Sequence, residues 1–374
     1  MDVVALGESM VTFVPTRPGP LADVPTFSRA VGGAESNVAC AMAALGHSAR
    51  WVSRVGADGF GECVVAGVAE YGVDVSTVHR DPSRPTGVYF RTAADRGSGA
   101  HEVAYYRAGS AASAMSPANV DMRAVRDCRI LHLSGITAAL SADCHDLLHR
   151  LTAPAASRPL ISFDINYRPA LWREEDAART LLELARRADI VFVGEDEAAE
   201  VWGVTGGPGA IRGVLPEPGV LVVKQGERGA TAFRQAAGGT PAGGGTPSAP
   251  SGATGPRPAP AQGTSEPTVT VNAVTEGTFE PSPAVTAVST IGAGDSFAAG
   301  YLSATLRSLP LRRRLRHGHL LAAATLTTPT DLAPPPTRAH ADHLAALDDA
   351  AWGRLRLAPG WTQTAWAPEE ASTP

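Results

Sequence analysis

The residues best suited to chemistry lie in one short stretch, Gly292-Ala293-Gly294-Asp295. The apolar run Val285–Val288 before it predicts a strand, and the pattern from Ser296 onward predicts a helix. Glycines at a strand-to-helix turn let backbone N–H groups point into one concavity, where the helix dipole favours an anion. Asp295 stands at the same place and could accept a proton from a substrate hydroxyl. An anion hole beside a base is what phosphoryl transfer to an alcohol requires, although these residues could equally form only a turn and a helix N-cap.

Such a turn needs a scaffold, and short apolar strands alternate with helical stretches along most of the chain. Repeated strand–helix alternation predicts an α/β fold with a mostly parallel central sheet covered by helices on both faces. Ligands bind such sheets at the carboxyl ends of the strands, where the polar clusters of this chain fall. The predicted strands are Val3–Leu6, Arg50–Val55, Ile130–Leu133, Leu160–Phe163, Ile190–Val193 and Val220–Lys224, and the predicted helices are Ser36–Leu45, Phe60–Tyr71, Glu174–Arg187 and Ser296–Leu309.

Two segments, residues 11–31 and 85–107, break this alternation. They alternate in strand fashion with no helical pattern within either segment, which predicts a small antiparallel sheet that acts as a lid beside the main domain. Because open strand edges invite pairing, we expect a homo-oligomer formed through the lid.

Length and composition exclude several classes of protein. The chain has 374 residues and a net charge of -5, so it lacks the basic footprint of a nucleic-acid-binding protein. No apolar run reaches the ~18 residues of a membrane span. The four cysteines show no C-x-x-C spacing, and together with the lack of an N-terminal signal they predict a cytoplasmic protein. Lys224 is the only lysine, and Val223 rather than glycine precedes it, which excludes a P-loop.

Glycine and proline are concentrated in residues 236–268, which hold 8 Gly and 7 Pro and no large apolar residue. Such a segment cannot bury enough apolar surface to order itself, so we expect a disordered insertion at a hairpin tip. The remaining organisation is one large domain over residues 1–330. Residues 331–374 are expected to form a final helix over 338–350 and a loose tail after Pro359.

The motifs now identify a family resemblance. Thr290-Ile-Gly-Ala-Gly-Asp-Ser-Phe297 is similar to the C-terminal signature of the ribokinase-like (PfkB) carbohydrate kinases. Gly32-Gly33-Ala-Glu-Ser-Asn37-Val-Ala39 and Arg54-Val-Gly-x-Asp58-x-x-Gly61 resemble the N-terminal motifs of that family. The resemblance covers residues 1–330 outside the insertion. It implies the ribokinase-like fold with its β-sheet lid, ATP and Mg²⁺ as cofactors, and a small sugar as the partner.

Three further stretches resemble the 2-keto-3-deoxygluconate kinases within this family: Tyr105–Ala111, Leu131–Ser141 and Asp164–Trp172. An acidic sugar needs a cation, and Arg107 on the lid can bind a carboxylate through two hydrogen bonds. Tyr89 and Tyr106 could contact the carbon chain. Adjacent residues of a strand face opposite sides, so Tyr106 and Tyr105 are almost equal candidates.

The resemblance also implies roles for residues at the other strand ends, each with a structural alternative. Asp164 would orient its loop, and Arg168 could be only a surface ion pair. Glu197 occupies the Glu of an N-x-x-E motif linked to Mg²⁺, but Gly194 stands where the Asn belongs, so a helix-start carboxylate is a serious alternative. The implied sugar ligands are Gly33 and Asn37, the implied nucleotide and phosphate ligands are Asn166, Tyr167, Arg168, Lys224, Gly226 and Gly229, and the implied catalytic residues are Asp295 with Gly292, Ala293 and Gly294.

The chain departs from the family in its last third. Ser289 replaces an Asp, His319 stands where the family has an Asn near adenine, and Thr330–Pro336 replaces a Gly-rich stretch. The expected reaction is phosphorylation of the terminal hydroxyl of 2-keto-3-deoxygluconate by ATP. The alternatives are a fructokinase-like kinase of a neutral sugar and a sugar-binding regulator without phosphoryl transfer.

Overall fold

The structure, a computed structural model, describes residues 1–17, 19–92, 103–172, 174–235 and 277–363. Its main domain is built on one eight-stranded sheet in the order β14-β13-β12-β11-β10-β9-β1-β4. The pairs from β4 to β12 are parallel, and β13 and β14 are added antiparallel. The strands are β1 Val3–Leu6, β4 Ala49–Val52, β9 Ile130–Ser134, β10 Leu160–Asp164, β11 Ile190–Gly194, β12 Val220–Lys224, β13 Gly229–Arg234 and β14 Thr278–Pro281.

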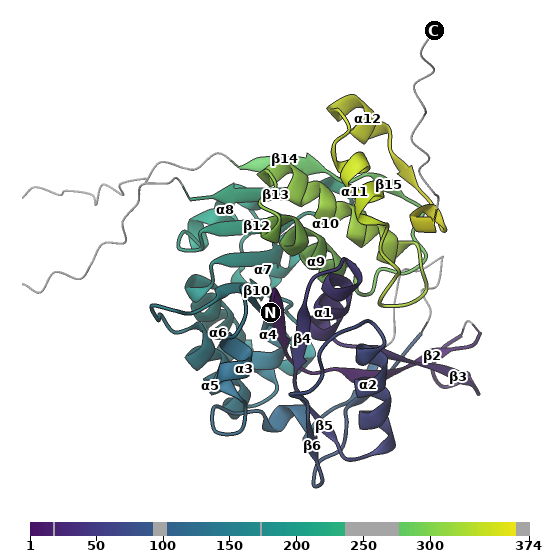
Figure 1. Cartoon of the computed structure of the whole chain (residues 1–374), viewed down its shortest axis with the longest axis vertical. Helices are drawn as coiled ribbons and strands as arrows, with labels where there is room; N and C mark the ends of the chain where they lie inside the picture. The colour runs from purple at the N-terminus through teal and green to yellow at the C-terminus, as the bar shows by residue number, and fades with distance from the viewer. Residues whose placement is uncertain (18, 93–102, 173, 236–276, 364–374) are drawn as a thin grey trace, which may run out of the picture.

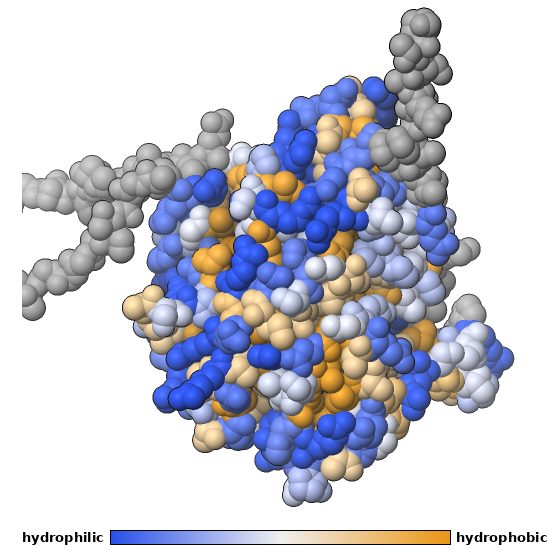
Figure 2. Space-filling view, in the orientation of Figure 1, coloured by the Kyte–Doolittle hydropathy of each residue, from blue (hydrophilic) through white to orange (hydrophobic). Residues whose placement is uncertain are grey.

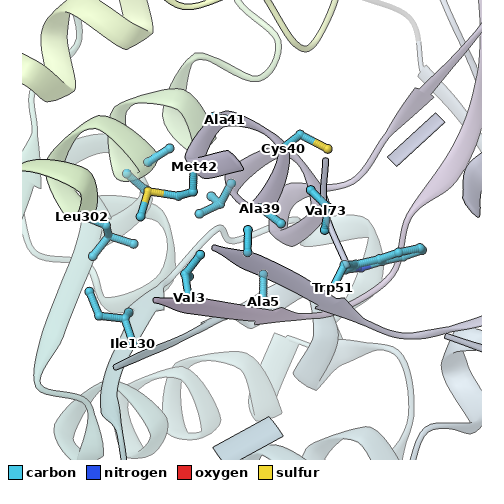
Figure 3. Close-up of a cluster of buried hydrophobic side chains, with 14 of the residues drawn as sticks. Val3, Ala5, Ala39, Cys40, Ala41, Met42, Trp51, Val73, Ile130 and Leu302 are labelled. Carbon is cyan, nitrogen blue, oxygen red and sulfur yellow. The ribbon is translucent and has the colours of Figure 1, made fainter. Parts of the chain in front are cut away.

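Helices cover both faces of this sheet (Figure 1), as the strand–helix alternation predicts. Successive residues of a strand point to opposite faces, so Val3 and Ala5 lie in one buried cluster while Val4 and Leu6 lie in another. Figure 3 shows the first cluster, in which Met42 and Leu302 pack against Val3 and Ile130. Its helices are α1 Ala34–Ala44, α2 Gly59–Ala69, α9 Ala293–Leu306 and α10 Leu311–Leu326, and those of the second are α3 Met122–Arg126, α4 Gly135–Ala139, α5 Ala142–Thr152, α6 Glu174–Arg187, α7 Glu195–Trp202 and α8 Gly207–Val214.

The expected lid is a separate four-stranded sheet in the order β3-β2-β7-β8, and its strands β2 and β3 project from the main domain (Figure 1). The prediction of a purely antiparallel sheet is wrong at one pair, because β2 and β7 run parallel. Residues of the main domain separate these two strands in the chain, so the connection is a long crossover, which parallel strands require. The strands are β2 Met10–Pro15, β3 Phe27–Gly32, β7 Val88–Arg91 and β8 Val103–Tyr106; β5 Arg54–Gly56 and β6 His79–Asp81 form a small pair nearby.

The C-terminal region differs from its prediction. Two helices, α11 Arg338–Ala345 and α12 Asp349–Arg354, replace one helix over 338–350, because the side chain of Asp348 caps a new helix. The predicted strand Val285–Val288 is reduced to β15 Ala284–Val285, which pairs with β16 Arg356–Leu357. Trp361 is only 8% exposed and packs with α10 and α12, so the chain is not loose directly after Pro359. The predicted insertion 236–268 and the tail from residue 364 lie outside the described residues.

The surface is polar over much of the face shown in Figure 2, with apolar residues scattered between charged ones. In the part of the chain that the structure describes, no helix is long and apolar enough to cross a membrane.

Candidate active site

The carboxyl ends of β10, β11 and β12 meet at one edge of the sheet and bring opposite charges together. Asp164 ends β10, and both of its carboxylate oxygens accept hydrogen bonds from the ammonium group of Lys224, at 3.2 and 3.0 Å. Lys224 ends β12, and its charge is favoured by Asp164, Glu197 and Asp295, which raise its pKa against the opposing effect of burial. The only lysine of the chain is therefore a charged group at the centre of this edge.

A tight turn stands at Gly292, where the sequence predicts an anion hole. Gly292 has a φ of +77°, and a Cβ atom there would lie 2.2 Å from the carbonyl oxygen of Asp331, so glycine is required. The helix α9 begins directly after it. A Cβ atom on Gly294 would lie 3.6 Å from Nζ of Lys224, which places the ammonium group beside the positive end of this helix.

Asp295 lies in the first turn of α9, where its side chain is held by α1. Its Oδ2 accepts a hydrogen bond of 2.8 Å from Nδ2 of Asn37. Burial raises the pKa of Asp295 to about 7, and the charge of Asp164 adds to this rise, while Asn37, Arg168 and Lys224 oppose it. A carboxylate with a pKa near neutrality can take a proton from a hydroxyl and release it again.

The Gly33 turn, which is predicted to bind the sugar and is called the sugar-side turn below, precedes α1. A Cβ atom on Gly33 would lie 2.4 Å from the carbonyl oxygen of Glu8, so the turn packs tightly on the segment that follows β1. Asn37 is buried, and its Oδ1 has no hydrogen-bond partner within the described structure. With Nδ2 committed to Asp295, this oxygen is an acceptor that a sugar hydroxyl can satisfy.

The loop after β10 brings the next three predicted residues close to the same edge. Asn166 adopts a φ of +43°, and its N–H donates to Oδ1 of Asp164 at 3.1 Å. The N–H of Tyr167 donates to Oε1 of Glu197 at 3.1 Å. Arg168 has an exposed guanidinium group whose Nη1 lies 3.9 Å from that same oxygen. The predicted loop-orienting role of Asp164 therefore has a direct contact to support it.

Glu197 holds backbone groups on two sides. Its Oε2 accepts the N–H of Gly194 at 2.6 Å and its Oε1 accepts that of Tyr167, which is the alternative role of a helix-start carboxylate. Burial raises its pKa. Across the described ranges, no group of three or more His, Cys, Asp or Glu side chains could hold a metal ion by itself.

The two glycines after Lys224, Gly226 and Gly229, differ in the space that is available for a side chain. Gly226 has a φ of +59° and open space where a Cβ atom would stand, so its backbone is accessible to a ligand. Gly229 has a φ of +140°, and a Cβ atom there would lie 2.3 Å from the carbonyl oxygen of Glu280 on β14. Gly229 is therefore required by packing.

On the lid, the choice of Tyr106 over Tyr105 does not match the structure. Tyr106 is 66% exposed and packs on Phe90, on the opposite face of the sheet from Tyr89. Tyr105 stands directly opposite Tyr89, with their ring centroids 5.5 Å apart. Arg107 lies over the Tyr105 ring at 5.6 Å, so Tyr89, Tyr105 and Arg107 share one side.

The lid residues are held by two carboxylates that sequence reasoning missed. Buried Glu8 forms an ion pair with Arg107. Buried Asp331 accepts a hydrogen bond from the Tyr89 hydroxyl at 2.8 Å and pairs with Arg91 at 2.9 Å. Glu8 had a weak signal, since it follows a strand and a glycine, whereas Asp331 lies in a proline-rich stretch with none.

His319 has a structural role in the described structure. It is buried, its Nε2 lies 3.1 Å from the carbonyl oxygen of Glu280, and its ring packs on Phe297. Burial lowers its pKa to about 4, so the ring is neutral.

Comparison with known proteins identifies the family of this chain. The chain matches the pfkB family carbohydrate kinase model over residues 1–246 and 263–338. It is 32% identical to the 2-dehydro-3-deoxygluconokinase of Bacillus subtilis (strain 168), over 90% of this chain and 93% of that protein. It is 36% identical to the enzyme of the same name from Thermoproteus tenax, over 62% and 72%, and 35% identical to a rice fructokinase-1 (Oryza sativa subsp. japonica), over 54% and 62%.

Solved structures show the same fold. A PfkB protein from Polaromonas sp. JS666 superposes with a TM-score of 0.71 at 30% identity, over 91% of this chain and 99% of that one. An uncharacterized sugar kinase from Pyrococcus horikoshii, solved in complex with ATP, superposes with a TM-score of 0.71 at 22% identity, over 94% and 100%. The fold and site thus define a ribokinase-like sugar kinase. The chain belongs to the pfkB family of carbohydrate kinases, and the predicted family and enzyme class are confirmed.

Proposed function

We propose that this kinase transfers the γ-phosphoryl group of ATP to the terminal hydroxyl of 2-keto-3-deoxygluconate, also called 2-dehydro-3-deoxygluconate. The observation that carries the proposal is Asp295, whose pKa of about 7 suits a base, placed beside the Gly292 turn and Lys224. The names of the two 2-dehydro-3-deoxygluconokinase relatives support the substrate, and a neighbour solved with ATP supports the nucleotide.

Asp295 would accept the proton of the attacking hydroxyl, and Asn37 would hold its carboxylate in place. The N–H groups of Gly292, Ala293 and Gly294 would stabilise the equatorial oxygens of the transferring phosphoryl group. Lys224 lies close enough to this turn to balance the charge that arrives with the phosphate.

Mg²⁺ is held in proteins by one or two carboxylates together with phosphate oxygens and water. The residues present fit that pattern, because Glu197 lies beside the loop Asn166–Arg168. It can act through water while its oxygens accept backbone N–H groups. The ion would supply neutralisation of phosphate charge. Arg168, whose side chain is exposed at the end of this loop, would add a second positive charge.

The sugar would lie between the Gly33 turn and the lid. Asn37 Oδ1 would accept a sugar hydroxyl, and Arg107 would bind the carboxylate. Tyr89 and Tyr105 would provide apolar faces for the carbon chain, and Tyr105 would take the role that the sequence predicts for Tyr106. Lys224, Gly226 and the loop Asn166–Arg168 would contact the nucleotide. Homo-oligomer formation through the lid and a cytoplasmic location stay predictions.

A second candidate is a kinase of a neutral sugar. One observation favours it: Arg107 is already paired with Glu8, so its charge is balanced without a substrate carboxylate. The fructokinase relatives, which match about half of the chain, point the same way. A sugar-binding regulator is disfavoured by the intact Asp295 and its turn, and would release no ADP.

The test is ADP release with Mg-ATP and a panel of sugars that includes 2-keto-3-deoxygluconate and fructose. Arg107→Ala should lower kcat/KM for the acidic sugar about 100-fold, because a charge-assisted bidentate contact is lost, and should change fructose little. Arg29→Ala, an exposed arginine of the same sheet, is the matched control. Preference for fructose together with an unaffected Arg107→Ala variant would replace the proposal with the second candidate.

A further inference from the structure

Glu8 is a buried carboxylate that joins the main domain to the lid. Its Oε2 accepts the Nε–H of Arg107 at 2.7 Å and is also ion-paired with Nη2, and its Oε1 accepts the hydroxyl of Ser110 at 2.5 Å. Arg107 and Ser110 are the two ends of one turn, which is closed by the Ser110 N–H and the Arg107 carbonyl oxygen at 3.0 Å. Glu8 therefore holds both ends of the turn that carries Arg107.

The position of Glu8 connects this turn to the floor of the sugar site. Its carbonyl oxygen blocks any Cβ atom on Gly33, and its Oε1 would lie 3.0 Å from a Cβ atom on Gly87, which directly precedes β7. One residue thus touches the sugar-side turn with its backbone and the lid with its side chain. A substitution of Glu8 would affect Arg107 first, since no other charged group is hydrogen-bonded to the Glu8 carboxylate in the described structure.

The geometry of a guanidinium group gives this contact a direction. Arginine can bind a carboxylate through its side edge, Nε and Nη2, or through its end edge, Nη1 and Nη2. Glu8 occupies the side edge. A substrate carboxylate would then meet the end edge, with the Tyr105 ring fixing the plane of the group from one side.

Resting on the proposed function, we infer that Glu8 is a positioning residue that determines the preference for an acidic sugar. It aims the end edge of Arg107 at the substrate carboxylate and acts only through that arginine. Glu8 contributes to recognition of the acid group. Its substitution should therefore change KM and leave the chemical step at Asp295 unchanged. A residue that only stabilised the fold would instead lower activity toward every sugar alike.

The experiment is a double-mutant cycle of Glu8 and Arg107, assayed by ADP release with 2-keto-3-deoxygluconate and with fructose. Glu8→Ala should raise KM for the acidic sugar roughly 30-fold with kcat within about 3-fold, and Glu8→Gln, which keeps shape and acceptor, should raise it roughly 5-fold. Fructose kinetics should stay within about 2-fold in both variants, since Arg107 has no partner on a neutral sugar. Ser110→Ala removes only the hydroxyl, and should cost at most about 3-fold.

The decisive comparison is made in the Arg107→Ala background. There Glu8→Gln should have no further effect on KM, because a residue that acts through Arg107 has nothing left to position. An equal loss in both backgrounds, or an equal loss with both sugars, would overturn the inference. Glu8→Gln and the fructose assay keep the test valid if Glu8→Ala fails to fold. A wild-type enzyme that ignores 2-keto-3-deoxygluconate would instead refute the proposed function, and that result is read before any variant is made.

Discussion

The two sides of the site are built in different ways. On the side proposed to bind phosphate, here called the phosphate side, Asp164 and Lys224 stand at the ends of the parallel strands β10 and β12. Asp295 joins them from the first turn of α9, directly after the glycine turn. On the lid side, the side chains are fixed by ion pairs between residues far apart in sequence, Glu8 with Arg107 and Asp331 with Arg91. The phosphate side is thus specified by local motifs, and the lid side by tertiary contacts.

This contrast predicts that the largest loss follows from a change on the phosphate side. Asp295→Asn should reduce kcat by about 10³-fold or more, because a general base typically contributes 10²- to 10⁴-fold and the amide cannot accept the proton. Sugar and ATP binding should be retained, since Asn can still accept the hydrogen bond from Asn37. Single-turnover kinetics and sugar titration separate the two effects.

The stability of Asp295→Asn provides its control. The folded-state pKa of Asp295 is raised to about 7, so the wild type loses stability as pH rises from about 4 to 7 and the buried carboxyl ionises. The amide does not ionise, and the variant should have a Tm at pH 8 no lower than that of the wild type. A lower Tm would mean that the loss of turnover reflects damage to the fold.

A smaller effect is expected from Lys224, whose charge would favour the ionised form of the proposed base, Asp295. In the wild type, the cation of Lys224 neutralises Asp164 and lowers the pKa of Asp295. Lys224→Met removes this cation, so the pKa of Asp295 should rise further. The acidic limb of kcat/KM against pH should move to higher pH. A rise of about one pKa unit should cost about 10-fold in kcat/KM at pH 6, since below the pKa each unit lowers the ionised fraction of the carboxyl by about a factor of ten. Lys224→Arg should restore the wild-type limb. If the acidic limb of the Lys224→Met profile does not move, Lys224 acts only in packing or in contact with the nucleotide.

The same contrast explains how far the sequence predicts the molecule. The parallel sheet, helix α6 and the Gly292 turn follow from patterns within a few residues, and the structure has them where the patterns place them. The side of the lid that faces the site could not be chosen locally, because Tyr105 and Tyr106 are neighbours and only the pairing of β8 with Tyr89 separates them. Asp331 was missed for the same physical reason, since its partners on β7 are about 240 residues away in sequence.

The smallest effect should come from the Tyr89 hydroxyl, which sharpens the comparison on the lid side. That hydroxyl donates to Asp331, which also holds Arg91 and packs its carbonyl oxygen against Gly292. Tyr89→Phe removes one hydrogen bond worth about 1 kcal/mol, so kcat/KM should fall about 5-fold through KM while the ring keeps its packing. Asp331→Asn should cost more, because it leaves buried Arg91 without a charged partner. The measurement is kcat and KM for 2-keto-3-deoxygluconate in both variants. A loss above about 50-fold in Tyr89→Phe, larger than a hydrogen bond that only holds the ring in place can explain, would place this hydroxyl on the sugar instead of on Asp331.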